Sequence, residues 1–118
     1  MTMYVDGYVL PVPKKNLDAY KEMASLAGKI WMEHGALSYT ECIAEDVKPG
    51  THTSFPQAVK LEEGEIVVFS WITYKSREDR DRINATVMED PRIKCTPETM
   101  PFDGKRMIWG GFVPIVQL

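Results

Sequence analysis

The sequence predicts a ferredoxin-like α+β sandwich, in which an antiparallel sheet carries two helices on one of its faces. Its length of 118 residues suits one domain, which we place over residues 1–118. Four segments rich in branched and aromatic residues alternate with two segments of helical periodicity, in the order strand, helix, strand, strand, helix, strand. Because strand crossovers are right-handed, this order brings all four strands into a single sheet.

The first half of the chain predicts a strand, a helix and a second strand. Residues 3–12 are rich in valine and tyrosine, which favour strands. From Asn16 to His34 the apolar residues recur three and four positions apart, which is typical of one helix face. Asn16 is the expected N-cap of this helix, and Gly35 is its expected left-handed C-terminal cap. Residues 36–45 form the expected second strand.

The second half of the chain predicts a strand, a helix and a last strand, after an irregular region. We expect a short extended piece over residues 58–61 and a strand over residues 65–74. A helix over residues 76–90 and a last strand over residues 106–116 are expected to follow. Ser76 and Asp79 have the spacing of a capping box, which predicts the start of the second helix. Asp90 precedes Pro91 and therefore avoids helical geometry, so the helix is expected to end there.

Both faces of the predicted sheet are apolar. In the third strand Phe69 and Trp71 point to one face, and Val68 and Ile72 point to the other. Two helices cover only one face, so the second face would expose a larger apolar patch than monomers normally carry. We therefore expect a homodimer that packs sheet against sheet. The alternative is that the loop over residues 47–56 folds across the open face.

Charge and composition exclude several classes of protein. The formal charge is -3 and the pI is about 5.4, whereas a surface that binds nucleic acid has to be basic. The longest apolar stretch, residues 107–116, is shorter than the roughly 18 residues that a membrane span needs. Residues 1–10 contain no lysine or arginine, so we expect no signal peptide and a cytoplasmic protein. Cys42 and Cys95 are expected to be free thiols.

Asp6 is the candidate catalytic residue, because it is an acid in the middle of an apolar strand. In a dry cavity such a carboxylate is suited to act as a general acid or base. The alternative is a structural carboxylate that pairs with Arg106 or Lys105. We consider this pairing because the first and last strands are expected to be neighbours and buried charges are normally paired.

The expected ligand-binding residues are Asp6, Trp71, Trp109, Arg106 and His52. The two tryptophans would form an aromatic wall, although buried aromatic residues more often belong to the core. His52 lies in the long loop and would reach the site from there. The alternative is that this histidine is simply exposed to solvent. The histidines and cysteines lack the close spacing of ligand pairs, so we expect no metal. The chain also has no phosphate loop and no dinucleotide fingerprint, so we expect no cofactor.

Four segments have a distinctive sequence, and they are VDGYV (5–9), VFSWI (68–72), DPR (90–92) and MPFDGKRMI (100–108). Together they resemble the YbaA-like family of uncharacterised bacterial proteins, over nearly the whole chain. The resemblance implies a subunit of the dimeric α+β barrel superfamily, in which two sheets enclose a cavity. That superfamily includes cofactor-free monooxygenases, haem-degrading enzymes, lactone isomerases and ligand binders, so the fold alone selects no function.

Three hypotheses of function follow from these observations. The first is a cytosolic homodimer whose sheet-lined cavity binds a small, mostly apolar molecule. The second is a cofactor-independent monooxygenase or isomerase that uses Asp6 as its acid or base. The third is a structural or interaction protein with a filled interior. A pocket of about 300 Å³ or more would favour the first two hypotheses.

Overall fold

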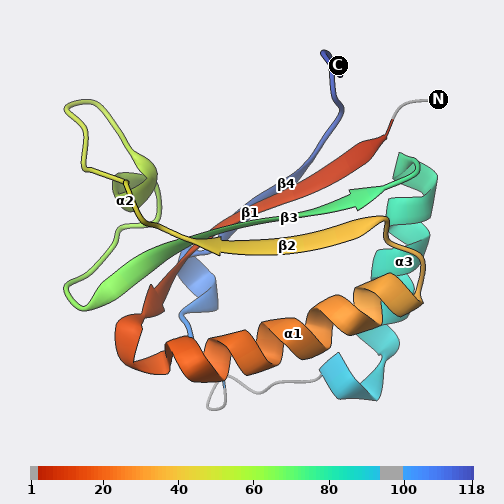
Figure 1. The fold of residues 1–118 in the computed structure, drawn as a ribbon, viewed down its shortest axis with the longest axis horizontal. Helices are drawn as coiled ribbons and strands as arrows, with labels where there is room; N and C mark the ends of the chain where they lie inside the picture. The colour runs from red at the N-terminus through yellow and green to blue at the C-terminus, as the bar shows by residue number, and fades with distance from the viewer. Residues whose placement is uncertain (1–2, 94–99) are drawn as a thin grey trace.

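The computed structural model describes residues 3–93 and 100–118, which form a four-stranded antiparallel sheet with two long helices on one face (Figure 1). The strands are β1 (Tyr4–Pro13), β2 (Ser38–Ile43), β3 (Glu65–Tyr74) and β4 (Ile108–Phe112). The helices are α1 (Leu17–Glu33), α3 (Arg77–Glu89) and the short α2 (Phe55–Ala58) before β3. The ferredoxin-like α+β fold predicted from the sequence is confirmed.

The strands lie side by side in the order β2-β3-β1-β4. The two long central strands pair along their whole length, from Tyr4 opposite Tyr74 to Pro13 opposite Glu65. The shorter β4 lies along the other side of β1 and pairs only with residues 5–9. The first and last strands are therefore neighbours, as predicted, and β2 and β4 form the two edges of the sheet.

Helix α1 follows the predicted periodicity, since Tyr20, Ala24, Ile30 and Trp31 are buried on one face. Gly35 adopts a φ of 117°, which confirms the predicted left-handed residue after the helix. The prediction that Asn16 caps the helix with its side chain is wrong.

The Asn16 amide turns away from the helix instead. Its Nδ2 donates a hydrogen bond to the carbonyl oxygen of Pro101 at 3.1 Å, because a short 3₁₀ turn at residues 14–16 leads into α1.

In the part of the chain that the structure describes, no helix is both long and apolar enough to cross a membrane.

Helix α3 begins at the predicted cap. The Ser76 hydroxyl accepts a hydrogen bond from the backbone N–H of Asp79 at 3.1 Å, which satisfies one of the free donors in the first turn. Ile83 and Val87 are fully buried against the sheet, while most of the other side chains on this helix are charged or exposed. Helix α3 therefore depends on these two residues and on the buried polar contacts described below for its position on the sheet.

The core fills the space between the sheet and the two long helices in two clusters. The larger cluster joins β1 and β3 to both helices and contains Tyr4, Ile30, Trp31, Ala36, Ile72, Tyr74, Ile83 and Val87. The second cluster lies near the start of α1 and contains Leu10, Val12, Tyr20, Ala24 and Val68. The side chains that β1 and β3 contribute to these two clusters lie on the face that the helices cover.

Two predicted elements differ from the structure. The extended piece expected over residues 58–61 is wrong, since Ser54 caps the short helix α2 and a turn with a positive φ at Lys60 follows it. The last strand is shorter than the expected 106–116, because Arg106 belongs to a 3₁₀ turn and the chain leaves the sheet after Phe112.

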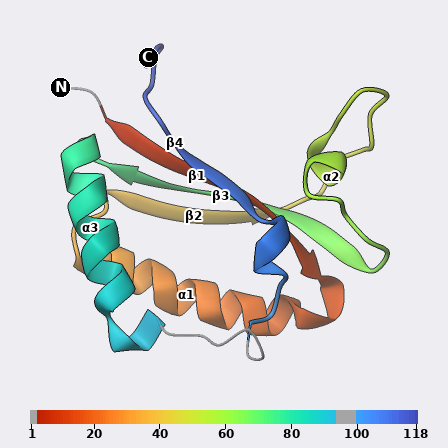
Figure 2. The same cartoon turned by 180° about the vertical axis from the view of Figure 1, so that it is seen from behind.

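The face of the sheet opposite the helices carries exposed apolar side chains. Phe69 is 44% exposed, Ile108 is 46% exposed and Phe112 is 62% exposed. The α2 loop stands at one end of this face and the C-terminal segment projects at the other (Figures 1 and 2). Phe55 of α2 contacts Phe69, with 6.0 Å between the ring centroids. The loop therefore borders one end of the open face and does not fold across it.

Candidate functional site

A cleft of about 1010 Å³ opens between the sheet and the helices α1 and α3. It lies on the helix-covered face, whereas the sequence resemblance places a cavity between the sheets of two chains. Its walls are mostly apolar and include Leu10, Met23, Ala27, Ile72, Met107 and Trp109. A cleft of this volume with such walls is large enough to bury the apolar body of a small molecule.

Aromatic rings form two sides of the cleft. Tyr8 of β1 and Trp109 of β4 are stacked, with 6.2 Å between their centroids and 18° between their planes. Trp31 of α1 and Tyr39 of β2 are also in contact, with 6.0 Å between their ring centroids. All four rings line the cleft, so flat apolar surfaces are available on both sides.

Glu41 of β2 places a carboxylate in the cleft. The Tyr20 hydroxyl donates a hydrogen bond to its Oε1 at 2.5 Å, and the Tyr39 hydroxyl donates to its Oε2 at 2.6 Å. A second hollow of about 1000 Å³ lies between α1 and β2, and the same three side chains line it. The two tyrosines and the glutamate therefore form the partition between the two hollows.

These tyrosines remain hydrogen-bond donors at neutral pH. Burial raises the pKa of Tyr20 and of Tyr39, and the neighbouring Glu41 charge raises both further because it opposes a second negative charge. Burial also raises the pKa of Tyr8, with a further contribution from Asp6. The phenol groups in the cleft are therefore protonated, and Glu41 is held by neutral donors.

Asp6 of β1 lies behind the wall of the cleft and is 0% exposed. Its Oδ2 accepts hydrogen bonds from the Tyr74 hydroxyl and from Asn84 Nδ2, both at 3.2 Å. Asn84 Oδ1 in turn accepts a hydrogen bond from Trp31 Nε1 at 2.9 Å. One buried carboxylate is thus connected to β3, α1 and α3.

Arg80 of α3 is the cationic partner of Asp6. Its Nε lies 3.3 Å from Asp6 Oδ1, although within the described residues neither atom has a well-aligned hydrogen bond. Its Nη2 donates to the Tyr4 hydroxyl at 3.0 Å, and its Nη1 lies 3.1 Å from Asp81 Oδ1. Arg106 or Lys105 is the partner expected from the sequence, but the Asp6 side chain points to the face on which α3 packs.

Gly111 leaves room for this ion pair. A Cβ at Gly111 would collide with the Tyr4 hydroxyl and with Arg80 Nη2, whereas a Cβ at Gly110 would meet Phe112 at an ordinary 3.7 Å or more. We expect Gly111→Ala to lower the free energy of unfolding by about 1–3 kcal/mol, the usual cost of overpacking. Urea denaturation of Gly111→Ala and Gly110→Ala measures the difference, and equal losses in the two variants would contradict this explanation.

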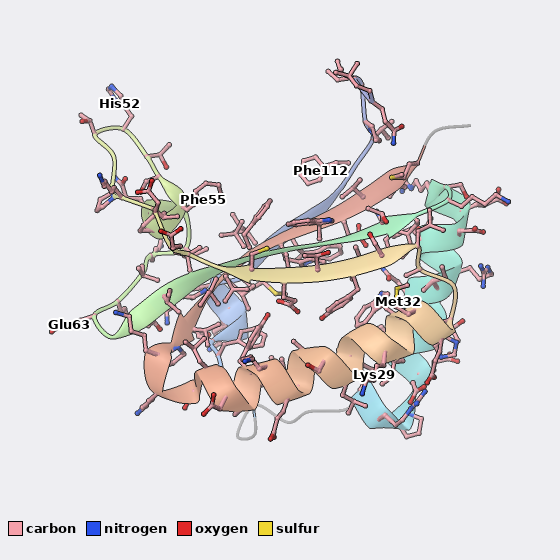
Figure 3. The ribbon with its side chains drawn as sticks, in the orientation of Figure 1. Lys29, Met32, His52, Phe55, Glu63 and Phe112 are labelled. Atoms are coloured by element: carbon pink, nitrogen blue, oxygen red, sulfur yellow. The ribbon has the colours of Figure 1, made fainter. Side chains whose placement is uncertain are left out.

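The structure brings few of the predicted site residues together. Trp109 lines the cleft, and Asp6 lies behind its wall. Trp71 is on the open face of the sheet, where its ring contacts Phe69 at 5.5 Å. His52 is at the tip of the loop before α2, on the side of the sheet away from the helices (Figure 3).

Arg106 is bound in a separate cluster near the start of β3. Its Nη2 lies 2.7 Å from Glu65 Oε2, its Nε lies 2.9 Å from Asp103 Oδ2, and its Nη1 donates to the Lys60 carbonyl oxygen at 3.0 Å. The hydrogen bond from Arg106 holds the pKa of Glu65 below its usual range. Arg106 therefore ties the turn before β4 to β3.

The described residues contain no group of three or more histidine, cysteine or acidic side chains arranged to hold a metal ion. Cys42 is an exposed free thiol on β2. Cys95, the other cysteine considered in the sequence analysis, lies outside the described residues.

The sequence matches the model of one protein family, described as "Protein of unknown function (DUF1428)", over residues 3–104. The chain belongs to the DUF1428 family. Its DUF1428 relatives include the uncharacterised protein YbaA of Escherichia coli K12 and the same-named protein of Shigella flexneri. Each is 56% identical over 113 residues, which cover 96% of this chain and 97% of the relative. The YbaA-like family predicted from the sequence is confirmed.

Solved structures with the same fold have much lower sequence identity to this DUF1428 chain. A dimeric ferredoxin-like protein from an uncultured marine organism has a TM-score of 0.62 at 12% identity, and the match covers all of both chains. A NIPSNAP family protein of unknown function from Agrobacterium tumefaciens has a TM-score of 0.57 at 14% identity, covering 95% of this chain and 87% of that protein. At these identities the likeness establishes the fold alone.

Glu41 and its two tyrosine partners in the DUF1428 cleft are not among the site residues expected from the sequence. A signal was present, because Tyr39, Glu41 and Ile43 alternate along one strand and therefore share one face. An acid between two apolar residues on the inward face of a strand is as unusual as Asp6. The tyrosine that meets it from α1 is 21 positions away in the sequence, so the contact itself required the fold.

Proposed function

We propose that this DUF1428 protein binds a small, largely apolar molecule in the cleft between the sheet and the two long helices. The observation that carries this proposal is the cleft of about 1010 Å³ with apolar and aromatic walls and a single tyrosine-bound glutamate at its inner partition. Methionines contribute four of the lining residues, and their flexible side chains adapt to the shape of a ligand.

We also propose that the protein works as a homodimer. The exposed apolar side chains of the open sheet face support this, since they would be shielded by the same face of a second copy. The α2 loop and the C-terminal segment stand at opposite ends of the face (Figure 1), and Phe69 on the central strand β3 is 44% exposed. The marine protein of the same fold is described as dimeric. A location in the cytoplasm and the absence of a nucleic-acid partner stay predictions.

Filling the cleft with a larger side chain is expected to abolish ligand binding. The probe is N-phenyl-1-naphthylamine, an uncharged molecule whose fluorescence increases in apolar surroundings. Ala27 of α1 lines the cleft, so Ala27→Phe places an aromatic ring in the space that the probe would occupy. We expect wild type to bind the probe saturably and Ala27→Phe to weaken binding by about tenfold or more.

The matched control is Ala85→Phe, which adds the same ring at an exposed position of α3 outside the cleft. This variant is expected to bind the probe as wild type does. The proposed function is wrong if wild type shows no saturable binding, or if the two variants bind equally well.

A further inference from the structure

We propose that Glu41 is the polar binding group of the cleft, and that it accepts a hydrogen bond from a hydroxyl or ammonium group on an otherwise apolar ligand. This inference rests on the proposed function and names the class of ligand that the cleft selects. It is carried by the position of the carboxylate, by its hydrogen bonds and by its charge.

The position of Glu41 is fixed from two sides. Its backbone pairs with Ser70 of the central strand β3, so the residue belongs to the rigid sheet. Its side chain points to the helix-covered face and lines both hollows. Tyr20 from α1 and Tyr39 from β2 hold one carboxylate oxygen each. A ligand group that reaches the partition would meet a carboxylate that is already oriented, so little conformational entropy is lost on binding.

The carboxylate retains the capacity to accept further hydrogen bonds. An ionised carboxylate has about four acceptor positions on its two oxygens, and the two tyrosine hydroxyls occupy one on each oxygen. A third donor can therefore bind without displacing either tyrosine. An acceptor group on the ligand would be repelled, because every position that faces it on Glu41 is also an acceptor.

Among the described residues, no lysine, arginine or histidine forms an ion pair with Glu41 that would neutralise its charge. The two arginines that line the cleft are engaged elsewhere, since Arg80 pairs with Asp6 and Arg92 pairs with Asp90 and Glu33. A hydrogen bond to a charged group is stronger than one between neutral groups, so a donor on the ligand gains most at Glu41.

The remaining walls select the body of the ligand. Aromatic rings of Trp31, Tyr39, Tyr8 and Trp109 face the cleft together with several methionines. Such walls suit a flat apolar skeleton of one or two rings, and their π-faces also favour an ammonium group. We therefore infer that the ligand combines a ring system with one hydroxyl or amine.

Three probes that share a naphthalene skeleton test this inference. They are α-naphthol, with a neutral donor, naphthylmethylamine, with a cationic donor, and methylnaphthalene, with no donor. Isothermal titration of the full chain is expected to give about tenfold tighter binding for at least one donor probe than for methylnaphthalene, as a hydrogen bond to a charged group predicts. The ratio between the two donor probes identifies the preferred donor.

Glu41→Gln removes the charge with little change of shape and is expected to remove this preference while leaving the affinity for methylnaphthalene unchanged. Glu63→Gln is the control, since Glu63 is an exposed glutamate in the turn before β3 (Figure 3) and does not line the cleft. The control is expected to keep the preference. If both variants lose it equally, the overall charge of the protein and not Glu41 selects the donor, and the inference is wrong.

The outcomes separate this inference from the proposed function. If none of the three probes binds wild type, both the proposed function and the role of Glu41 are wrong. If all three bind with equal affinity, the cleft binds apolar molecules but Glu41 is not its polar binding group. If Glu41→Gln does not fold, the double variant Tyr20→Phe and Tyr39→Phe replaces it, because it frees both carboxylate oxygens. The preference for donor probes is then expected to exceed that of wild type, and a loss would contradict the inference.

Discussion

Replacing Asp6 with alanine is expected to lower the free energy of unfolding by about 3–5 kcal/mol, the cost of breaking a buried ion pair by removing one partner. The Asp6 carboxylate is 0% exposed and its Oδ1 lies 3.3 Å from Arg80 Nε. Its loss removes the buried anionic partner of the guanidinium and leaves Asp81, which is exposed, beside it. It also leaves Tyr74 and Asn84 without the oxygen to which they donate. Urea denaturation monitored by tryptophan fluorescence measures the change.

Asp81→Ala is the control for this prediction. Asp81 also contacts Arg80, at 3.1 Å, but its side chain is 54% exposed. An exposed ion pair is worth at most about 1 kcal/mol, so the control is expected to lose little stability. If Asp6→Ala and Asp81→Ala had the same free energy of unfolding, the assignment of a structural role to Asp6 would be wrong. The hypothesis of an enzyme with Asp6 as its acid or base would then gain support.

Introducing a charge on the open face of the sheet is expected to dissociate the homodimer. Phe69 is 44% exposed at a central strand and contacts both Phe55 and Trp71. In a symmetric interface Phe69→Asp removes two apolar side chains and buries two charges, which is expected to raise the dissociation constant by about a thousandfold. Sedimentation velocity at micromolar concentration is expected to show a dimer for wild type and a 13.4 kDa monomer for the variant.

Met32→Asp is the matched control, because Met32 is 45% exposed but lies on α1, in the layer opposite the open face (Figure 3). This variant is expected to remain a dimer. Circular dichroism of both variants establishes that each is folded. A monomeric wild type, or dissociation by Met32→Asp alone, would place the interface elsewhere or exclude a dimer.

The fold was predictable because its signals are local. The helix periodicity between Asn16 and Gly35 and the cap at Ser76 depend on residues a few positions apart, and the structure places both helices accordingly. Errors occur where distant contacts decide the local structure. Asn16 was expected to cap α1, but its amide bonds to Pro101, 85 positions along the chain. The run from Val113 onward is apolar enough for a strand, yet the chain has left the sheet by that point.

The candidate site was less predictable, since its residues come from distant elements. Asp6 was identified as unusual from its apolar neighbours in the sequence. Its partner Arg80 lies on α3, where its spacing from Ile83 and Val87 places it on the inward face of the helix, but only the fold brings that face against Asp6. Trp71 and Trp109 resemble each other in the sequence, but the register of the strands places them on opposite faces of the sheet.

The hydrogen-bonded group around Asp6 also bears on how the protein folds. Its members come from β1, β3, α1 and α3, so a partly folded chain that lacks any one of these elements leaves a buried polar group without its partner. Such intermediates are disfavoured, and unfolding should be a concerted transition even though α3 contributes few apolar side chains to the core. The slowest amide hydrogen exchange is accordingly expected for the backbone N–H groups of β1, β3, α1 and α3 that lie next to these side chains.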